Sequence, residues 1–506
     1  QDGEFYSSIL GYLAKSQRAV SIVDQSNLLE CTKQVFEQCR KNIDLKLNVP
    51  LSNEQVIAGA FNVNPMDGKK SAGFSFPGKK KYDILREHDG KPMLNAELAE
   101  KIKQAYDWMD KGYGIQNVCV AAEKDELKDK KKFTDGLTRI FFAGDVVFMW
   151  FCKKYLGPIF ALMMASRENL SCQVGVNAIG PEFHKMLHDI SDGDFDDPGA
   201  TDGDWSGWDT SVMGIVYSLI MFLWLYEESP YYINNPKELF YVKCILEAMQ
   251  CWSALLNKQL IAKEDQMPSG EYGTSQINSE ANEILACYRF YFCYAKHHHI
   301  PINGMMVRRV TNEIRYHDKV TPKTFGDDIF EFMKKDARYF MNTERVREFA
   351  KMIGMDWTPA HKTETEFKFK PIREILFLKR TPRYEPILKR YVGKLEQKSI
   401  AKMLGYCDSN DPNWSKAVEY TAIREMSFHG EEEYQKLHKY FGFNLPPREQ
   451  ILMEIDRNDG YMYEEPSTTI TKEESIFYCN DTVDMSSTGG ANVSINNTKG
   501  TFESSN

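Results

Sequence analysis

The stretch Phe325-Gly326-Asp327-Asp328-Ile329-Phe330 places two adjacent acids between apolar residues. Glycine followed by aspartate is typical of a tight turn, and apolar residues on both sides are typical of strands. The sequence therefore predicts two short strands within residues 310–333 that meet at Gly326-Asp327-Asp328. Such a hairpin would hold Asp327 at the floor of a cleft, although Gly-Asp-Asp alone is also a common structural turn.

A second pair of acids lies five positions apart in Gly203-Asp204-Trp205-Ser206-Gly207-Trp208-Asp209. Residues 193–206 predict a loop leading into a short strand, and residues 210–227 predict a long helix. Phosphoryl transfer with two divalent ions needs carboxylates from separate segments that converge on metals about 3.5–4 Å apart. Hard oxygen ligands suit Mg²⁺. The two acidic segments are therefore candidates for one metal site.

Between the two acidic segments lies a glycine loop that is predicted to run into a helix. It reads Pro268-Ser269-Gly270-Glu271-Tyr272-Gly273-Thr274-Ser275-Gln276-Ile277-Asn278-Ser279. Thr274 and Asn278 are four positions apart and share one helical face. A hydroxyl and an amide on that face are suited to hydrogen-bond a sugar hydroxyl. An ordinary N-capped helix is the alternative for this segment alone, but three such elements in this order are improbable by chance.

The composition fits a globular protein with more than one subdomain. The chain has 506 residues, 42% hydrophobic and 27% charged, which exceeds the usual size of a single core. A net charge of −9 argues against a general electrostatic binder of nucleic acid, but the basic residues are clustered. The three clusters favour a basic channel over scattered surface charge, and they comprise Lys69, Lys70, Lys79, Lys80 and Lys81; Lys124, Lys128, Lys130, Lys131, Lys132 and Arg139; and Lys362, Lys379, Arg380, Arg383 and Arg390.

Other sequence features indicate a reducing cytosol and no membrane span. The eleven cysteines contain no CxxC pair, so neither a disulfide framework nor a zinc site is expected. The sequence predicts no signal peptide. The most apolar run, residues 212–226, is short for a membrane span and is predicted to be a buried helix. Further helices are predicted at residues 94–109 and 146–165, and residues 384–445 are predicted to be mainly helical. A strand is predicted at residues 372–379, and a flexible tail over about the last forty residues.

With these segments in place, the chain resembles the RNA-dependent RNA polymerases of picornavirus-like positive-strand RNA viruses over about residues 50–390. The acids at Asp204 and Asp209 resemble motif A, Ser269 to Ser279 resembles motif B, and Phe325 to Asp328 resembles motif C. The four remaining motifs of that family have counterparts in Lys70-Ser71-Ala72-Gly73-Phe74 (motif G), Lys124-Asp125-Glu126-Leu127-Lys128 through Thr138-Arg139 (motif F), Gly354-Met355-Asp356-Trp357-Thr358-Pro359-Ala360-His361-Lys362 (motif D) and Phe377-Leu378-Lys379-Arg380 (motif E).

The chain departs from the family pattern at a few places. Phe325 stands where tyrosine is usual before Gly-Asp-Asp, and Lys128 stands where arginine is common. The lysine would replace a bidentate phosphate contact with a point charge. The first fifty residues match loosely, and the tail after about residue 465 has no counterpart.

The resemblance implies an α+β right-hand fold of fingers, palm and thumb, with an antiparallel palm sheet and a mainly helical thumb. The implied boundaries are residues 1–200 for the fingers with an N-terminal extension, 201–245 for the palm with motif A, 246–267 for a fingers insertion, 268–383 for the palm with motifs B to E, 384–465 for the thumb, and 466–506 for a flexible polar tail.

The resemblance also implies the role of each site residue. Asp204 and Asp327, supported by Asp328, would ligate two Mg²⁺ ions, for which Mn²⁺ can substitute, and Lys362 would protonate the leaving pyrophosphate. The ribose would be bound by Asp209, Ser269, Thr274 and Asn278, and the triphosphate by Lys124, Lys128, Lys132 and Arg139. Ser71 and Gly73 would contact the template, and Lys379 and Arg380 the primer.

The implied partners are RNA template and primer, NTPs, a protein primer and other viral replication proteins. The implied location is the host cytoplasm, at membrane-associated replication complexes, without a transmembrane segment of its own. Two other functions stay open. A reverse transcriptase also uses paired aspartates, but it would not need Asp209, Thr274 and Asn278. A catalytically silent RNA-binding relative would act without Mg²⁺.

Overall fold

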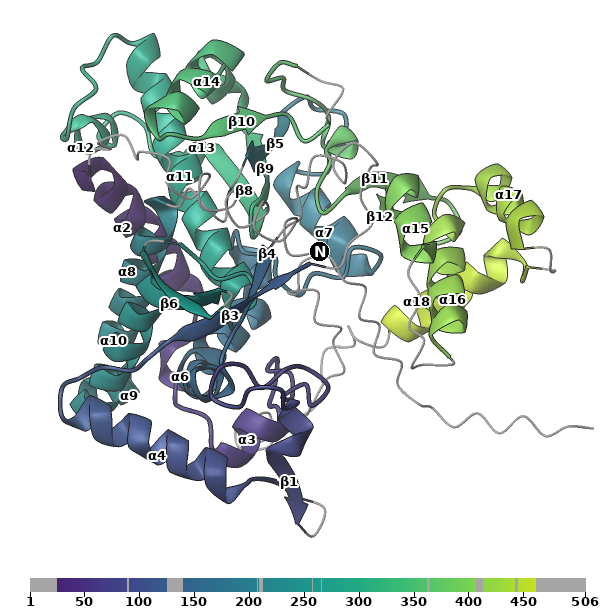
Figure 1. Cartoon of the computed structure of the whole chain (residues 1–506). Coiled ribbons are helices and arrows are strands. Elements are labelled where there is room, and N and C mark those ends of the chain that lie inside the picture. The colour runs from purple at the N-terminus through teal and green to yellow at the C-terminus, as the bar shows by residue number, and fades with distance from the viewer. Residues whose placement is uncertain are drawn as a thin grey trace, which may run out of the picture.

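The computed structural model of this chain describes residues 25–88, 91–124, 140–206, 208, 213–256, 258–264, 266–361, 365–405, 413–441 and 445–460. Two four-stranded sheets and a large set of helices form the body of the molecule (Figure 1). The helices α15–α18 near the end of the described chain are grouped at one side of this body (Figure 1).

The central sheet has the strand order β10-β5-β9-β8, and all of its pairings are antiparallel. Its strands are β5 (Ala200–Ser206), β8 (Val320–Phe325), β9 (Asp328–Met333) and β10 (Asp356–Thr358). Phe325 pairs with Asp328, so the loop between β8 and β9 contains only Gly326 and Asp327. The predicted hairpin at Gly-Asp-Asp is therefore confirmed.

The first half of the segment predicted as strands is helical instead. Residues 310–319 contain the end of α12 (Met306–Val310) and the short helix α13 (Tyr316–Lys319). Tyr316 is fully buried and donates from its hydroxyl to Glu331 of β9 at 2.9 Å. This tertiary contact fixes a helical turn that short-range periodicity does not distinguish from a strand.

Three helices pack around one another beside the central sheet: α11 (Thr274–His297), α8 (Met213–Glu228) and α2 (Gln25–Asn42). Helix α11 is buried from Thr274 to Ala295, because it packs against both helices and against β8. Its aromatic residues, which include Tyr288 and Phe290, belong to this core. The predicted helix at residues 210–227 corresponds to α8, apart from positions 210–212, which lie outside the described residues.

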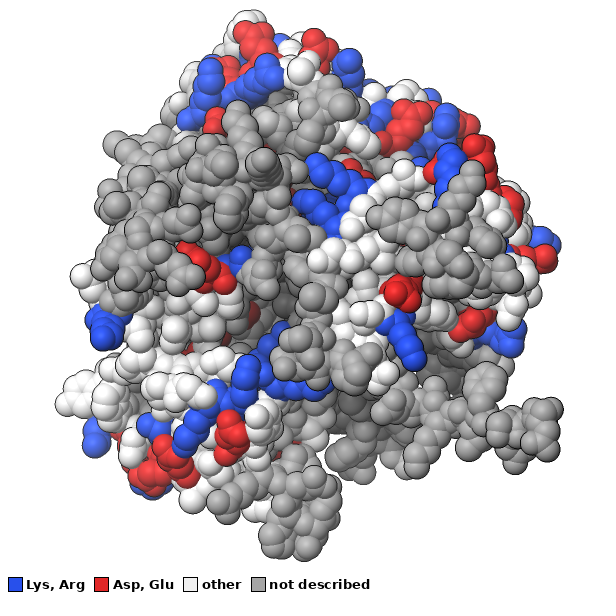
Figure 2. All heavy atoms as spheres, turned by 45° about the vertical axis from the view of Figure 1, so that its right-hand side comes forward, with Lys and Arg blue, Asp and Glu red and all other residues white. Residues whose placement is uncertain are grey.

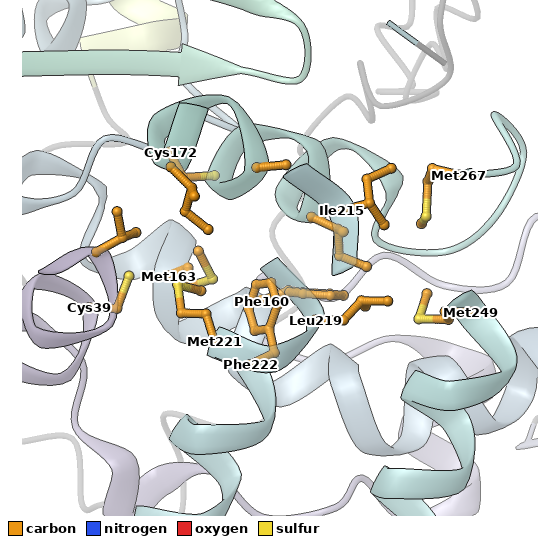
Figure 3. Packing of buried hydrophobic residues seen from close by; sticks show 14 of the residues in the cluster. Cys39, Phe160, Met163, Cys172, Ile215, Leu219, Met221, Phe222, Met249 and Met267 are labelled. Atoms are coloured by element: carbon orange, nitrogen blue, oxygen red, sulfur yellow. The ribbon is translucent and has the colours of Figure 1, made fainter. Parts of the chain in front are cut away.

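The same core extends into the first half of the chain. Figure 3 shows Phe160 and Met163 of α6 (Val146–Ala165), Leu219 and Phe222 of α8, and Cys39 of α2 directed into one shared interior. The bounds of α6 match the predicted helix. Its length and apolar composition would allow a membrane span, but 83% of its apolar 18-residue stretch is buried within the protein. This degree of burial is typical of a core helix.

The outer sheet has the order β4-β3-β6-β7. Its strands are β3 (Val118–Glu123), β4 (Ile140–Ala143), β6 (Cys251–Leu256) and β7 (Gln259–Glu264). Strands β3 and β6 are parallel, with Val118 opposite Ser253. The segment predicted as a fingers insertion thus supplies two strands to a sheet that begins more than a hundred residues earlier in the chain.

Further elements complete the body of the molecule. Helix α3 (Asn53–Ala58) begins after Ser52, whose side chain forms a capping box with Gln55, as the sequence predicts. The predicted helix at residues 94–109 is α4 (Ala96–Asp110). The remaining elements are β1 (Leu85–His88), β2 (Lys91–Leu94), α7 (Pro181–Ile190), α9 (Pro230–Asn234), α10 (Pro236–Gln250) and α14 (Thr343–Met352).

The C-terminal part begins with a hairpin and continues with helices, so the prediction of a mainly helical segment over residues 384–445 is confirmed, apart from the hairpin. Strands β11 (Arg380–Glu385) and β12 (Arg390–Leu395) precede α15 (Gln397–Leu404), α16 (Trp414–Ser427), α17 (Glu431–Phe441) and α18 (Arg448–Gly460). The predicted strand at residues 372–379 is wrong. The segment holds the 3₁₀ turn Ile372–Glu374 and then a tight turn, because Leu378 and Lys379 both have positive φ, at 56° and 58°.

Candidate active site

Two neighbouring strands bring the predicted metal-binding acids together. Asp204 on β5 lies one residue beyond the pair Gly203–Ile329, so continuation of the register places it opposite Asp328 at the start of β9. Asp327 is exposed in the turn, and Asp204 and Asp328 are half-buried. Oxygen ligands from two separate segments therefore meet at one end of the central sheet.

Helix α11 holds both strands of this acidic site. Asn282 donates from Nδ2 to the carbonyl oxygens of Asp327 at 2.8 Å and Gly326 at 3.2 Å. Its Oδ1 accepts from Nε1 of Trp205 on β5 at 3.0 Å. Ser279 accepts from the N–H of Gly326 at 2.8 Å. Sequence reasoning missed Asn282, although its spacing of four from Asn278 on a helix is a signal that could have found it.

The carboxylates suit Mg²⁺ by their chemistry. Among the residues that the structure describes, no three His, Cys, Asp or Glu side chains form a ready-made metal cluster. Mg²⁺ does not require one, since it is usually bound by one or two carboxylates together with waters and substrate phosphates. Asp204 and Asp328, with Asp327 beside them, supply carboxylates of this kind.

The loop before α11 presents the residues predicted to bind ribose. Asn278 is 5% exposed, and its Oδ1 has no hydrogen-bond partner among the residues that the structure describes. A buried acceptor without a partner is costly, so a ligand donor would be favourable there. The hydroxyl of Thr274 lies 2.7 Å from the carbonyl oxygen of Glu271 and 3.1 Å from that of Pro268, so it stabilises the loop. Ser269 is half-buried.

Close backbone packing fixes the position of this loop. Gly270 forms a bridge with Ala143 at the end of β4. A methyl group on Gly270 would lie only 2.2 Å from the carbonyl oxygen of Phe142, so only glycine allows this approach. The loop that carries Ser269 and leads into α11 at Thr274 therefore lies against the outer sheet.

The residues predicted to contact the template include Gly73, which lies against Gly144 and Asp145, the two residues that follow β4. Ser71 is exposed, and its Oγ accepts from the N–H of Gly73 at 3.2 Å. Gly73 has a φ of +82°, and a methyl group there would lie 2.7 Å from Cα of Asp145. Asp145 accepts from the N–H and the hydroxyl of Ser75 at 2.6 and 2.9 Å. These contacts hold residues 71–75, which we call the template loop after their predicted role, against the start of α6.

The two residues predicted to contact the primer have different surroundings. Lys379 is exposed at the tip of the turn between Phe377 and Arg380. Arg380 is buried, and it donates to both carboxylate oxygens of Glu425 on α16 at 2.7 and 2.8 Å and to the carbonyl oxygen of Gly393. The guanidinium of Arg380 therefore joins the hairpin to the C-terminal helices, and Lys379 is the side chain available to a primer.

Five predicted site residues lie outside the described residues: Asp209, Lys128, Lys132, Arg139 and Lys362. Lys124 directly follows β3 and is half-buried. Of the first basic cluster, Lys69, Lys70, Lys79 and Lys80 are exposed, whereas Lys81 is buried. Figure 2 shows Lys and Arg side chains gathered in two groups toward the middle of one face, an arrangement that attracts a polyanion.

Comparisons with known proteins agree with this arrangement. The profile of the family described as viral RNA-dependent RNA polymerase matches residues 3–443. The replicase polyprotein of Drosophila C virus (strain EB) is 24% identical over 466 residues, covering 86% of this chain and 25% of that polyprotein. The genome polyprotein of Human parechovirus 2 (strain Williamson) is 24% identical over 417 residues, covering 80% of this chain and 16% of that polyprotein. The chain thus spans a quarter or less of the length of these relatives.

The fold is similar to that of a solved viral polymerase. The structure of Sicinivirus 3Dpol RNA dependent RNA polymerase matches with a TM-score of 0.69 and 16% identity, covering 86% of this chain and 85% of that chain. This match confirms the predicted right-hand fold, whose central sheet is antiparallel as predicted, and the profile covers all the segments in which the seven motifs were found. The chain belongs to the viral RNA-dependent RNA polymerase family, and its relatives are polyproteins of picornavirus-like viruses.

Proposed function

We propose that this chain copies an RNA template into RNA by a two-metal-ion nucleotidyl transfer and thereby replicates the genome of a positive-strand virus. The observation that carries the proposal is the register of the central sheet, which places Asp204 beside the Gly326-Asp327-Asp328 turn. Asn282 supports it, because one side chain ties both acidic segments to α11.

Asp204 and Asp327 would hold the ions, and Asp328 would add negative charge beside them. Two bound Mg²⁺ ions would supply activation of the primer 3′-hydroxyl and neutralisation of charge on the α-phosphate. The protein itself must position the primer end and the triphosphate in line, which is most of the catalytic task in phosphoryl transfer.

Selection of ribose is assigned to the loop and the first turns of α11. Asn278 has a buried acceptor for the 2′-hydroxyl, and Ser269 lies on the loop before it. Thr274 acts by keeping the loop in shape, and Asp209 is assigned to the same hydroxyl through the motif A resemblance. A site built around a hydroxyl rejects a substrate that lacks it, because its polar groups are then left unpaired.

Basic residues would bind the phosphates of the substrate and of the RNA. Lys124, Lys128, Lys132 and Arg139 are assigned to the triphosphate, and Lys362 is assigned as general acid for pyrophosphate. Lys379 would contact the primer backbone, with Ser71 and Gly73 beside the template; such contacts position a strand without reading its sequence.

The remaining assignments concern the setting of the reaction. The polyprotein relatives support release of this chain from a longer product. A protein primer, other viral replication proteins, and membrane-associated replication complexes in the host cytoplasm are part of the proposal.

The proposal predicts that Asp327→Ala abolishes RNA synthesis and leaves RNA binding largely intact. The measurement is primer extension on poly(A) with labelled UTP and Mg²⁺, together with an RNA-binding titration. Asp107→Ala is the matched control, because Asp107 is an exposed acid on α4 that pairs with Lys103. Appreciable extension by Asp327→Ala would contradict the metal assignment, and RNA binding without extension by the wild type would favour the silent RNA-binding alternative.

A further inference from the structure

Three backbone segments meet at a buried junction beside the proposed ribose site. The loop at Gly270 lies against Phe142 and Ala143 at the end of β4. The template loop at Gly73 lies against the next residues, Gly144 and Asp145, where its hypothetical methyl group would be 2.7 Å from both the oxygen of Gly144 and Cα of Asp145. The end of β4 is thus enclosed between the loop that selects the nucleotide and the loop that contacts the template.

Glu271 places a carboxyl group inside this junction. Its residue is 6% exposed, and its Oε1 accepts from the N–H of Tyr272 at 3.1 Å. Its Oε2 lies 3.9 Å from Sγ of Cys119 on β3. A methyl group on Gly144, the residue after β4, would lie 3.3 Å from Oε1, so the carboxyl group is next to the chain that follows this strand. The side chain therefore lies between β3 and the residue that follows β4.

Other charged groups face Glu271 from the adjoining elements. Lys81 follows the template loop and is 4% exposed, with its Nζ 3.0 Å from Sδ of Met149. Asp145 at the start of α6 is 5% exposed. The thiols of Cys119 on β3 and Cys152 on α6 are also within electrostatic range of Glu271. Lys81 and Glu271 are thus a cation and an acid on different loops inside one buried junction.

Burial shifts the pKa values of Glu271, Lys81 and Asp145 away from their ordinary values. Desolvation raises the pKa of Glu271 to about 7, although hydrogen bonds from the Tyr272 N–H and the Asn117 side chain lower it; Asp145 adds to the rise and Lys81 opposes it. Desolvation lowers the pKa of Lys81 to about 8. Burial also raises the pKa of Asp145, although the N–H and hydroxyl of Ser75 oppose the change. Glu271 is therefore mostly neutral at pH 6 and mostly charged at pH 8.

The charge on Glu271 has a cost in stability. The pKa of Glu271 in the folded state lies above its ordinary value of 4.5. Folding is therefore weakened as pH rises from about 4.5 and fully so above the folded-state pKa. At the same time, a charged carboxylate accepts the Tyr272 N–H more strongly than a neutral acid does. The same ionisation thus tightens the loop while it destabilises the fold.

We propose that Glu271 is a positioning residue for nucleotide selection, whose carboxylate holds the loop that carries Ser269 and leads into α11 at Thr274, and thereby sets Asn278 for the ribose. This inference rests on the proposed polymerase function and deepens it. Glu271 acts through the loop and does not touch the substrate.

The test is discrimination between UTP and dUTP on a poly(A) template between pH 6 and pH 8.5. The ratio of the two kcat/KM values cancels any titration that the chemical step shares. We expect the wild-type ratio to fall about fivefold from pH 8 to pH 6, the loss expected for one weakened hydrogen bond. Glu271→Gln should show the low ratio at every pH. Glu247→Gln, a change of an exposed acid on α10, should retain the wild-type profile.

A stability measurement separates positioning from a structural role. Glu271→Gln should raise the thermal unfolding midpoint at pH 8, where the wild type carries the buried charge, and should have little effect at pH 5. A merely structural residue would lose stability and activity together. Lys81→Met gives a second test with Glu271 in place, because removal of the cation should move the titration of the UTP/dUTP ratio to higher pH.

Two results would overturn the inference: a wild-type ratio that does not change between pH 6 and pH 8, or a Glu271→Gln variant that keeps the wild-type titration. Either result, obtained with a wild type that incorporates UTP, leaves the proposed function standing. If the wild type incorporates no UTP at any pH while it binds RNA, the proposed function itself fails.

Discussion

Asn282 contacts two parts of the acidic site through one amide. Its Nδ2 binds the carbonyl oxygens of the β8–β9 turn, and its Oδ1 accepts from Trp205. Asn282 is fully buried, so neither half of the amide exchanges with water. The spacing between Asp204 and Asp327 therefore depends on a residue that carries no charge.

We predict that Asn282→Ala lowers the free energy of unfolding by about 1–3 kcal/mol, because it leaves the Trp205 N–H without a buried partner. Primer extension should fall by roughly 10- to 100-fold, since small displacements of reacting groups are costly. Urea unfolding followed by tryptophan fluorescence and kcat for UTP incorporation measure the two effects. Asn234→Ala on exposed α9 is the control, and full activity of Asn282→Ala would contradict the prediction.

Individual residues also show which parts of the candidate site could be predicted from the sequence. The motifs predicted Asp204, Asp327 and Asn278 as candidate site residues, because each lies in a short stretch of recognisable chemistry. The partner of Arg380 could not be identified, since Glu425 lies 45 positions away and no pattern links the two. The positive φ values of Leu378 and Lys379 were also hidden, because neither residue is the glycine or asparagine that usually marks such a turn.

At the scale of elements, the loop before α11 and the end of β4 act as one unit. Gly270 allows the two backbones to approach, and the bridge to Ala143 fixes their register. The geometry of the loop before α11 thus depends on the outer sheet.

Gly270→Ala should therefore be destabilising and inactive. The added methyl group would lie 2.2 Å from the carbonyl oxygen of Phe142, and backbone on both sides cannot yield. We expect a loss of about 1–3 kcal/mol, as for other overpacked sites, together with loss of UTP incorporation. Gly112→Ala is the comparison: nothing lies within 4 Å of its position, but its φ is +81°, so this variant shows the cost of backbone strain without a clash. A stable and active Gly270→Ala variant would show that the loop does not need this contact.

Long elements were more predictable than short ones that lack a turn signal such as Gly-Asp-Asp. The bounds of α6 follow from a long apolar run after the capping residue Asp145. The one-turn helix at Tyr316–Lys319 was predicted wrongly and the hairpin at Arg380–Leu395 was missed, because a few residues carry too little periodicity to separate helix from strand. Both are fixed by distant contacts, such as that between Tyr316 and Glu331.

At the scale of the whole molecule, buried ion pairs attach the C-terminal helices to the hairpin. Arg380 on β11 binds Glu425 of α16, and Glu385 at the end of the same strand binds Arg448 of α18. Lys379, next to Arg380, remains exposed. Of these adjacent basic residues, Arg380 thus attaches the helices, while Lys379 is left exposed for the proposed RNA contact.

We predict that Arg380→Ala lowers the free energy of unfolding by about 3–5 kcal/mol, because Glu425 is left as a buried charge without its partner. The double change Arg380→Met with Glu425→Leu should restore much of that stability. Lys379→Ala should leave stability within about 0.5 kcal/mol of the wild type and weaken RNA binding, with a salt dependence reduced by about one phosphate contact. Urea unfolding and RNA titration at several salt concentrations distinguish the two variants. Equal stability losses in both would contradict the assignment.

The parallel pairing of β3 with β6 has a consequence for how the protein is made. Val118 meets Ser253, so β3 lacks one neighbour until the ribosome has synthesised the chain beyond β6. During that interval β3 is an edge strand, and unpaired edges promote association between chains. The loop before α11 lies against the same sheet, so a nascent chain that ends before residue 251 cannot assemble the proposed substrate site. The template loop is therefore synthesised early, whereas the proposed activity requires the later part of the chain.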